Sequence, residues 1–265
     1  VVHERFMTDT AKYADIILPA TFSVEQTDIY EAYGYCTLST AYKIVEPQGQ
    51  CKSNWNTFKT LAESMGYDDE YFRKTEDEML GIVLSNPTEK LSNISDNDKR
   101  TLEAGGWISM PFSVHDKWKT KSGKIKIVNE KLKETMPRYT ECYGGSYPLS
   151  LVSVPSEHTL NSIFTQRDDM VENRGKMRLI INSKDADERK IKTGDKVLCF
   201  NDLADVEFEA YITDNIAAGA VAAVGIYKSS QTFGGLGVNA LQHDRLSDLG
   251  EATTMNDNRV DIRLL

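Results

Sequence analysis

The chain has 265 residues, of which 40% are hydrophobic and 27% charged, and its formal net charge is -9. This length exceeds the roughly 100 to 200 residues usual for one domain, so we expect two domains. The acidic balance argues against a nucleic-acid surface, which needs clustered Lys and Arg. No apolar run approaches the roughly 18 residues that a spanning helix requires, and we expect no membrane span.

The amino-terminal segment predicts a strand, a helical turn and a second strand. Residues 1–7 have a strand pattern, a turn follows through residue 14, and residues 15–19 are apolar and end in proline. Such units build an open α/β layer, whose ligands usually bind where strands end. The candidate ligand contacts at the end of the first strand are Thr8, Asp9 and Thr10.

The chain begins in the middle of a strand pattern, without an initiator Met or a signal peptide. We therefore expect it to be the carboxy-terminal part of a longer protein. The spacing of apolar residues predicts helices over 55–66 and 76–84, and a helix capped by Ser95 over 95–103. A turn at residues 120–123 leads into an alternating pattern over 124–128 that predicts a strand.

A linker rich in Gly and Pro runs from 136 to 147, which places the domain boundary near 146 and gives domains 1–146 and 147–265. Beyond it, short strands alternate with turns, and this spacing is typical of a small β-barrel. A short helix over 183–190, capped by Ser183, interrupts the strands. The predicted strands cover residues 149–154, 177–182, 196–200, 206–213, 220–226 and 259–264.

A dense cluster of polar side chains follows the first barrel strand. It combines hydroxyl, carboxylate, imidazole and amide groups within seven residues, which suits a polar heterocycle with many donors and acceptors. Further on, the glycines of 234–237 either allow backbone to approach a ligand or form an ordinary surface turn. Asn239 follows them and could read the edge of a base. The members of the cluster that we single out are Ser156, Glu157, His158, Thr159 and Asn161.

The sequence contains no complete catalytic constellation and no metal-binding motif. The four cysteines, Cys36, Cys51, Cys142 and Cys199, form no C-x-x-C pair and have no His at ligand spacing, so we assign neither catalytic nor metal-ligating residues. We expect free, buried thiols. This cysteine usage is compatible with a reducing cytoplasm, which is the location we expect, and it leaves the periplasm open.

Several segments, read in order, resemble the molybdopterin oxidoreductases of the dimethyl sulfoxide reductase family. The pattern Asp-Ala, Ile, Gly-Asp-x-Val, Gly-Ala-Val and Asn-Ala-Leu between residues 185 and 241 is similar to that family's molybdopterin-dinucleotide-binding domain. Residues 6–11, 14–20 and Glu25 resemble the stretch before that domain, and 120–125 resembles the family's Thr-x-Ser-Gly-Lys segment. Residues 26–30 depart from the Gly-rich form common in the family.

The resemblance implies a partial open α/β layer followed by a six-stranded double-psi β-barrel. It also implies that Ser156, Glu157, His158, Thr159, Asn161 and Asn239 touch a pterin cofactor, with Thr8, Asp9 and Thr10 facing it from the other domain. In the full enzyme the cofactor would be molybdopterin guanine dinucleotide with molybdenum or tungsten, serving two-electron or oxygen-atom transfer.

The metal ligand, and an iron-sulfur cluster where one exists, would belong to the missing amino-terminal part. The other expected partner is an electron-transfer subunit. We expect the fragment to be inactive and to bind no cofactor alone. The competing hypothesis is a stand-alone, non-enzymatic module that binds a small molecule or a protein.

Overall fold

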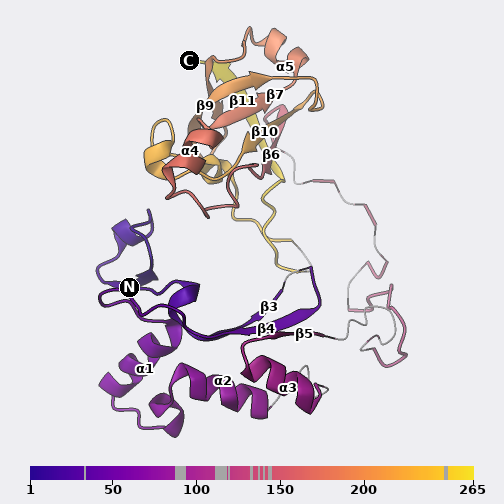
Figure 1. The fold of residues 1–265 in the computed structure, drawn as a ribbon. Coiled ribbons are helices and arrows are strands. Elements are labelled where there is room, and N and C mark those ends of the chain that lie inside the picture. The colour runs from indigo at the N-terminus through magenta and orange to yellow at the C-terminus, as the bar shows by residue number, and fades with distance from the viewer. Residues whose placement is uncertain are drawn as a thin grey trace. The chain divides into compact units, whose positions relative to one another are not determined.

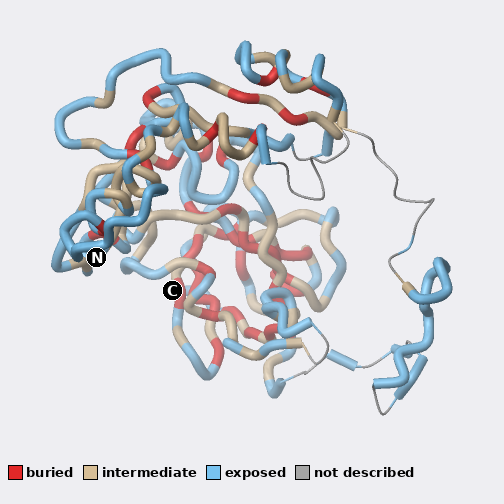
Figure 2. The backbone as a smooth tube through the Cα atoms, turned by 90° about the horizontal axis from the view of Figure 1, so that it is seen from below, coloured by how far each residue is buried: buried red, intermediate tan, exposed pale blue. Residues whose placement is uncertain are grey.

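The computed structural model describes residues 1–32, 34–86, 94–110, 118, 120–131, 134–136, 138–139, 141–142, 145–247 and 250–265. The chain divides into two compact units, Val1–Pro137 and Arg138–Leu265 (Figure 1). Each unit has a hydrophobic core of its own, and buried residues occur in both (Figure 2). No helix in the described ranges is both long and apolar enough to cross a membrane.

The first unit begins with the predicted strand, turn and strand. β1 (Val2–Glu4) and β2 (Ile17–Pro19) pair in parallel, with Val2 opposite Ile17. The turn between them is η1 (Ala11–Tyr13), a single turn of 3-10 helix. These strands are the parallel part of the α/β layer.

A second sheet in this unit was not predicted. β3 (Asp28–Glu31), β4 (Thr37–Ala41) and β5 (Trp107–Ser109) form an antiparallel sheet. Helices α2 (Glu76–Ser85) and α3 (Asp96–Glu103) share its core, which consists of Leu38, Leu80, Leu84, Leu102 and Ile108.

Local capping explains where the predicted helices begin. The side chains of Ser53, Thr75 and Ser95 each accept a backbone N–H three residues on, at the starts of α1 (Asn54–Ser64), α2 and α3. The cap at Ser95 was predicted. The short turns η2 (Ser23–Glu25) and η3 (Glu70–Arg73) complete the unit.

The helix predicted over 55–66 is present as α1, although Phe58, Leu61 and Met65 on it are exposed and only Ala62 is buried. One expectation for this unit was wrong. Residues 124–128 form no strand, although the turn before them is present, with Gly123 N–H donating to Thr120 O at 3.0 Å. Alternation produces a strand only where one face is covered, and Ile125 and Ile127 are both exposed.

The second unit is the expected six-stranded double-psi β-barrel. Its closed order is β10-β6-β11-β8-β9-β7, with parallel pairs β10·β6 and β7·β9 and antiparallel pairing elsewhere. Alternate side chains fill the interior, among them Leu151, Phe208 and Val260. The strands are β6 (Leu149–Val154), β7 (Arg178–Ile181), β8 (Lys196–Phe200), β9 (Asp205–Ile212), β10 (Ala220–Val224) and β11 (Asn258–Leu264).

Helices and turns fill the connections of the barrel. α5 (Ser183–Glu188) was predicted, but its cap is Asn182 and not Ser183, since Asn182 Oδ1 accepts Lys184 N–H at 2.9 Å. α4 (Asp168–Arg174) was not predicted, and neither were η4 (Ser229–Gln231) and η5 (Val238–Leu241).

Candidate functional site: two loops at one end of the barrel

The two loops that carry the predicted barrel contacts leave the same end of the barrel. β6 and β10 are parallel neighbours, and their last residues, Val154 and Val224, are paired. Segments 155–167 and 225–241 therefore begin side by side, and Figure 1 shows α4 close to the segment that follows β10. α5 lies at the opposite end, because β7 runs antiparallel to β10.

The predicted polar cluster forms the start of the first loop. Ser156 Oγ accepts the backbone N–H of His158 at 3.1 Å, which turns the chain just after the strand. Glu157, His158 and Asn161 are exposed, and Asn161 has a positive φ of 52°. Thr159 is only 4% exposed, and its Oγ1 has no hydrogen-bond partner among the residues that the structure describes.

A buried arginine ties the two loops to α4. Arg174 is 6% exposed, and its guanidinium donates to Ile226 O and to Gln231 Oε1, both at 2.8 Å. Gln231 Nε2 in turn donates to Thr165 O at 3.2 Å, which reaches the first loop. The guanidinium carbon lies 3.7 Å from the centre of the Tyr227 ring. Arg174 thus joins α4 to the second loop, and Gln231 joins the second loop to the first.

The electrostatics of this cluster follow from its burial. Burial lowers the pKa of Arg174, because the charged guanidinium loses water without gaining a carboxylate. Burial also raises the pKa of the Tyr227 hydroxyl, and Arg174 partly opposes that shift. Sequence reasoning missed Arg174 and Gln231, since a single Arg in a short helix and a single Gln in a turn belong to no motif.

The second loop is built on glycines with positive φ. Gly225 has φ +73°, and a Cβ there would lie 3.2 Å from Ser156 Cβ. Gly234 and Gly235 also have positive φ, with no backbone atom within 4 Å of their Cβ positions. Close approach therefore occurs at Gly225, outside the Gly-rich run, where Gly234 and Gly235 provide a backbone conformation that other residues rarely adopt.

Asn239 lies on η5 and is exposed. The last residue of η5 accepts a hydrogen bond from the buried Asn201, whose Nδ2 donates to Leu241 O at 2.8 Å. Within the described residues, no hydrogen bond joins Asn239 to the polar cluster of the first loop. The structure brings the loops to one end of the barrel without linking these two predicted contacts directly.

The predicted contacts of the first unit have local roles. Thr8 Oγ1 accepts Ala11 N–H at 3.2 Å and Asp9 pairs with Lys12 at 2.8 Å, so both side chains support η1. Thr10 is exposed. All three come after β1, which ends at Glu4 and not at residue 7 as the sequence pattern indicated.

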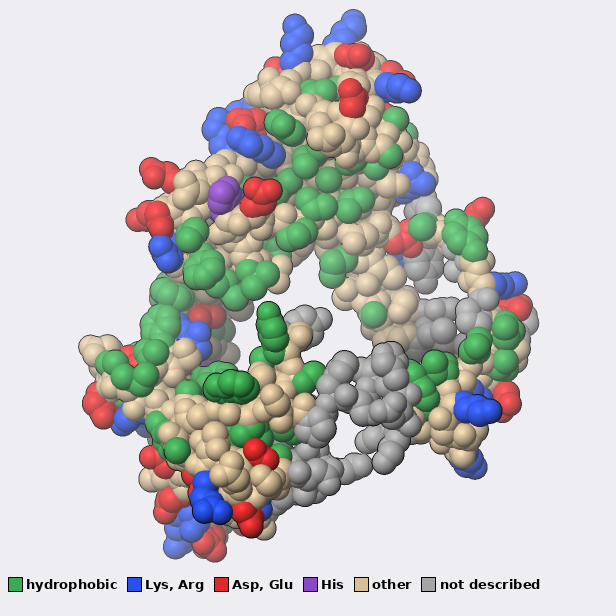
Figure 3. Space-filling view, turned by 45° about the vertical axis from the view of Figure 1, so that its right-hand side comes forward, with side chains coloured by type: hydrophobic (Ala, Val, Ile, Leu, Met, Phe, Trp, Pro, Cys, Tyr) green, Lys and Arg blue, Asp and Glu red, His purple; other side chains and the backbone are tan. Residues whose placement is uncertain are grey.

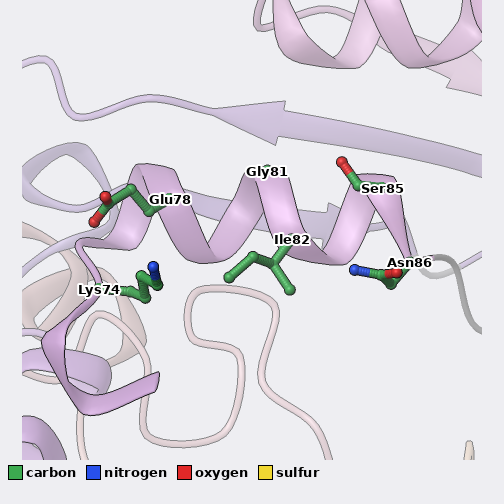
Figure 4. Close-up of a pocket in the computed structure, with 6 residues that line it drawn as sticks. All are labelled: Lys74, Glu78, Gly81, Ile82, Ser85 and Asn86. Carbon is green, nitrogen blue, oxygen red and sulfur yellow. The ribbon is translucent and has the colours of Figure 1, made fainter. Parts of the chain in front are cut away.

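Two hollows in the first unit contain none of the predicted residues. One, of about 300 Å³, lies along α2, where Lys74, Glu78 and Asn86 point in different directions (Figure 4). The other, of about 380 Å³, includes Glu76, which accepts hydrogen bonds from Thr27 N–H, Asn56 Nδ2 and Ser53 Oγ and so has a structural role. In the part of the chain that the structure describes, no group of three His, Cys, Asp or Glu side chains suits a metal ion.

The loop end of the barrel suits a large polar ligand. Thr159 Oγ1 and Arg174 Nε are buried without partners, and such atoms are costly unless something binds them. Exposed donors and acceptors surround them on Glu157, His158 and Asn161. Hydrophobic side chains also gather on the barrel face seen in Figure 3, and those exposed on the loops include Leu160, Ile163, Phe164 and Leu236. Buried polar atoms, exposed polar side chains and exposed hydrophobic side chains together fit a pterin dinucleotide.

The barrel and its loops match a known class of domain. Residues 149–258 match the family model described as Molydopterin dinucleotide binding domain, and residues 1–64 match the one described as Molybdopterin oxidoreductase. The chain belongs to the molybdopterin oxidoreductases of the dimethyl sulfoxide reductase family.

Individual relatives agree with this assignment. The chain is 32% identical to "Probable oxidoreductase YoaE" of Bacillus subtilis, over 99% of this chain and 39% of that protein. It is 26% identical to dimethyl sulfoxide reductase DmsA of Escherichia coli, over 84% of this chain and 32% of the relative. Acetylene hydratase from Pelobacter acetylenicus has the same fold, with a TM-score of 0.79 and 17% identity over 99% of this chain and 40% of that one. The chain thus spans about two fifths of the length of YoaE.

Proposed function

We propose that this chain is the cofactor-binding portion of a molybdenum or tungsten oxidoreductase that carries molybdopterin guanine dinucleotide. The observation that carries the proposal is the pair of loops fastened together at one end of a molybdopterin-dinucleotide-binding barrel, with two buried polar atoms left without partners. When bound, the cofactor would supply two-electron or oxygen-atom transfer at its metal. The chain's own task is to bind and orient it.

Each predicted residue has a chemical role in that task. Thr159 offers a buried hydroxyl, and Ser156 offers a hydroxyl hydrogen that no described residue accepts. His158, Asn161 and Asn239 are exposed side chains that can both donate and accept hydrogen bonds, as a pterin or guanine edge requires. Glu157 can accept from the amino group of either ring.

Other parts of the proposal concern the rest of the enzyme. Thr8, Asp9 and Thr10 would face the cofactor from the α/β layer, and the metal ligand would come from the preceding part of a longer polypeptide. That part could also hold an iron-sulfur cluster and meet an electron-transfer subunit. The 265 residues alone would then be inactive. The competing proposal, a stand-alone binding module, is favoured by the lack of a metal-ligand group within the described residues.

The decisive experiment is metal and pterin analysis of the protein made from its complete reading frame in a host that synthesises the cofactor. We expect stoichiometric molybdenum or tungsten, measured by elemental mass spectrometry, together with pterin fluorescence after oxidation. Absence of both would favour the stand-alone module.

The placement of the first loop has its own test in the same protein. His158→Ala should lower the cofactor content, whereas Lys184→Ala should not, because Lys184 is exposed on α5 at the other end of the barrel. Equal content in both variants would show that His158 does not contact the cofactor.

A further inference from the structure

The first loop of the barrel has few hydrogen bonds to the rest of the chain. The backbone hydrogen bonds within residues 157–166 close local turns. Among the described residues, only two hydrogen bonds join this segment to a distant part of the chain, and both come from the second loop. Lys228 Nζ donates to Gln166 Oε1, and Gln231 Nε2 donates to Thr165 O at 3.2 Å. These two side chains therefore determine where the first loop lies.

The conformation of the first loop needs such support. Asn161 has a φ of 52° and Phe164 a φ of 67°, which is the left-handed region that side chains other than glycine rarely adopt. Phe164 is also exposed, as are Leu160 and Ile163, so burial of apolar side chains does little to hold the loop. Two strained residues in a weakly packed segment keep their conformation only while the surrounding structure restrains them.

Gln231 is the side chain at which three segments meet. Its Oε1 accepts hydrogen bonds from Arg174 of α4 at 2.8 Å and from the backbone N–H of Lys228 at 3.3 Å, while its Nε2 donates to Thr165 O of the first loop. These partners fix the orientation of the amide, because two donors require its oxygen and a carbonyl requires its nitrogen. Gln231 thus sets the position of the first loop relative to α4 and the second loop.

We propose that Gln231 is a positioning residue for the dinucleotide cofactor, which it holds through the first loop and not by contact. Its bond to Thr165 O keeps His158 and Thr159 where they meet the ligand. This inference rests on the proposed function, because only a bound cofactor gives those side chains something to meet. It adds a residue whose effect comes from the placement of others.

A carboxylate in place of the amide separates the two links that Gln231 makes. Gln231→Glu keeps the acceptor for Arg174, whose buried guanidinium forms no ion pair with any described residue and would gain a counter-charge. The same substitution removes the N–H that bonds to Thr165 O. The matched control is Gln166→Glu, which adds the same charge but keeps the acceptor for Lys228 Nζ, the one hydrogen bond that Gln166 forms with described side chains.

The first test is hydrogen–deuterium exchange of the 265-residue chain, measured by mass spectrometry at the amides of Ile163 and Arg167, which are bonded within the loop at 2.9 and 3.0 Å. We expect Gln231→Glu to raise their exchange rate about fivefold or more, as for loss of one neutral hydrogen bond. Gln166→Glu should leave the rate unchanged. Equal exchange in the two variants would overturn the proposal.

The stability of the barrel separates positioning from a merely structural role. Urea unfolding, followed by the accessibility of the buried Cys199 thiol, should show no loss of stability in Gln231→Glu, because the link to Arg174 persists. A loss of stability relative to Gln166→Glu would contradict the proposal. The neutral Gln231→Met lacks the same N–H and should also speed exchange, which excludes repulsion by the added charge. It replaces Gln231→Glu in the exchange and dialysis measurements should that variant fail to fold.

The complete protein distinguishes failure of this inference from failure of the proposed function. Loaded protein is dialysed, and the remaining metal and pterin are measured by elemental mass spectrometry and by fluorescence. We expect Gln231→Glu to lose its cofactor about fivefold faster than Gln166→Glu does. If the unmodified protein contains neither metal nor pterin, the proposed function is wrong. If it is loaded and both variants retain the cofactor equally, only the role of Gln231 is wrong.

Discussion

Gly225 lies where the second loop passes close to Ser156 of the first loop. Its positive φ disfavours any side chain, and a Cβ would also press on Ser156 at 3.2 Å. We expect Gly225→Ala to lower the free energy of unfolding of the barrel by about 2–3 kcal/mol. Gly194→Ala is the matched control, since Gly194 has φ +93° with nothing within 4 Å, and it should cost about 1 kcal/mol. Urea unfolding followed by the accessibility of the Cys199 thiol measures both, and equal losses would exclude the contact.

Thr159 carries a buried hydroxyl that forms no hydrogen bond with any described residue. Replacing it by valine keeps the shape and removes the unsatisfied group, so Thr159→Val should stabilise the ligand-free barrel by about 1 kcal/mol. Thr165→Val should do the opposite, because Thr165 Oγ1 donates to Ser162 O at 2.7 Å. Urea unfolding followed by the accessibility of the Cys199 thiol measures the effect of both substitutions. Destabilisation by both substitutions would indicate that Thr159 has a partner.

At the residue scale, the sequence predicted the polar loop but not the hydrogen bonds that hold it in place. Residues 156–161 could be singled out because many functional groups follow directly after an apolar strand. Arg174 acts through Ile226 and Gln231, which lie more than fifty residues away along the chain, and only the closed barrel brings them together. The contacts of Ser156, His158 and Asn239 with a cofactor remain predictions.

Among the elements, α5 offers a test of which residue begins a helix. Asn182 is buried, with Oδ1 accepting Lys184 N–H and Nδ2 donating to Ile216 O at 2.7 Å. Asn182→Ala should therefore cost about 2 kcal/mol, through loss of the cap and of a second bond. Ser183→Ala removes only a hydrogen bond to Asp214 and should cost less than half as much. The ranking follows from Cys199 accessibility in urea, and the reverse ranking would restore Ser183 as the cap.

The sequence predicted elements well where the signal was local. Turn residues and alternating patterns located all six barrel strands, and Ser95 located the start of α3. The antiparallel sheet β3-β4-β5 escaped notice because its strands are short and β5 lies more than sixty residues after β4. Residues 124–128 carry the alternation of a strand, yet no strand of the described chain pairs with them. The periodicity of a short segment does not show whether a segment far away in the sequence pairs with it or buries one of its faces.

At the scale of the whole molecule, tryptophan and cysteine report on different units. The three tryptophans, Trp55, Trp107 and Trp118, all lie in Val1–Pro137, whereas Cys199 lies in the core of the barrel. Because the two cores share no residue, we expect tryptophan emission and Cys199 labelling to follow separate unfolding transitions in urea. Superimposed curves would mean that the units unfold together.

The cysteines also give a graded labelling pattern in the folded chain. Cys142 is exposed and should react within minutes with a thiol reagent, while the partly exposed Cys36 and Cys51 should react more slowly. Burial raises the pKa of the Cys199 thiol far above its ordinary value, so this group should react only when the barrel opens. Only one of the four thiols is fully buried, contrary to the expectation from sequence.

The closure of the barrel also determines how it can be joined to other polypeptides. Its first strand, β6, and its last, β11, are antiparallel neighbours, with Leu149 opposite Val260. The start of β6 therefore lies beside Val260, four residues before the end of β11. A short peptide could connect the two strands, and new ends could be opened at the exposed turn of Asp202 and Leu203 between β8 and β9. We therefore expect the barrel to tolerate circular permutation at this turn, and gene fusion could append it to an unrelated chain through a single covalent junction.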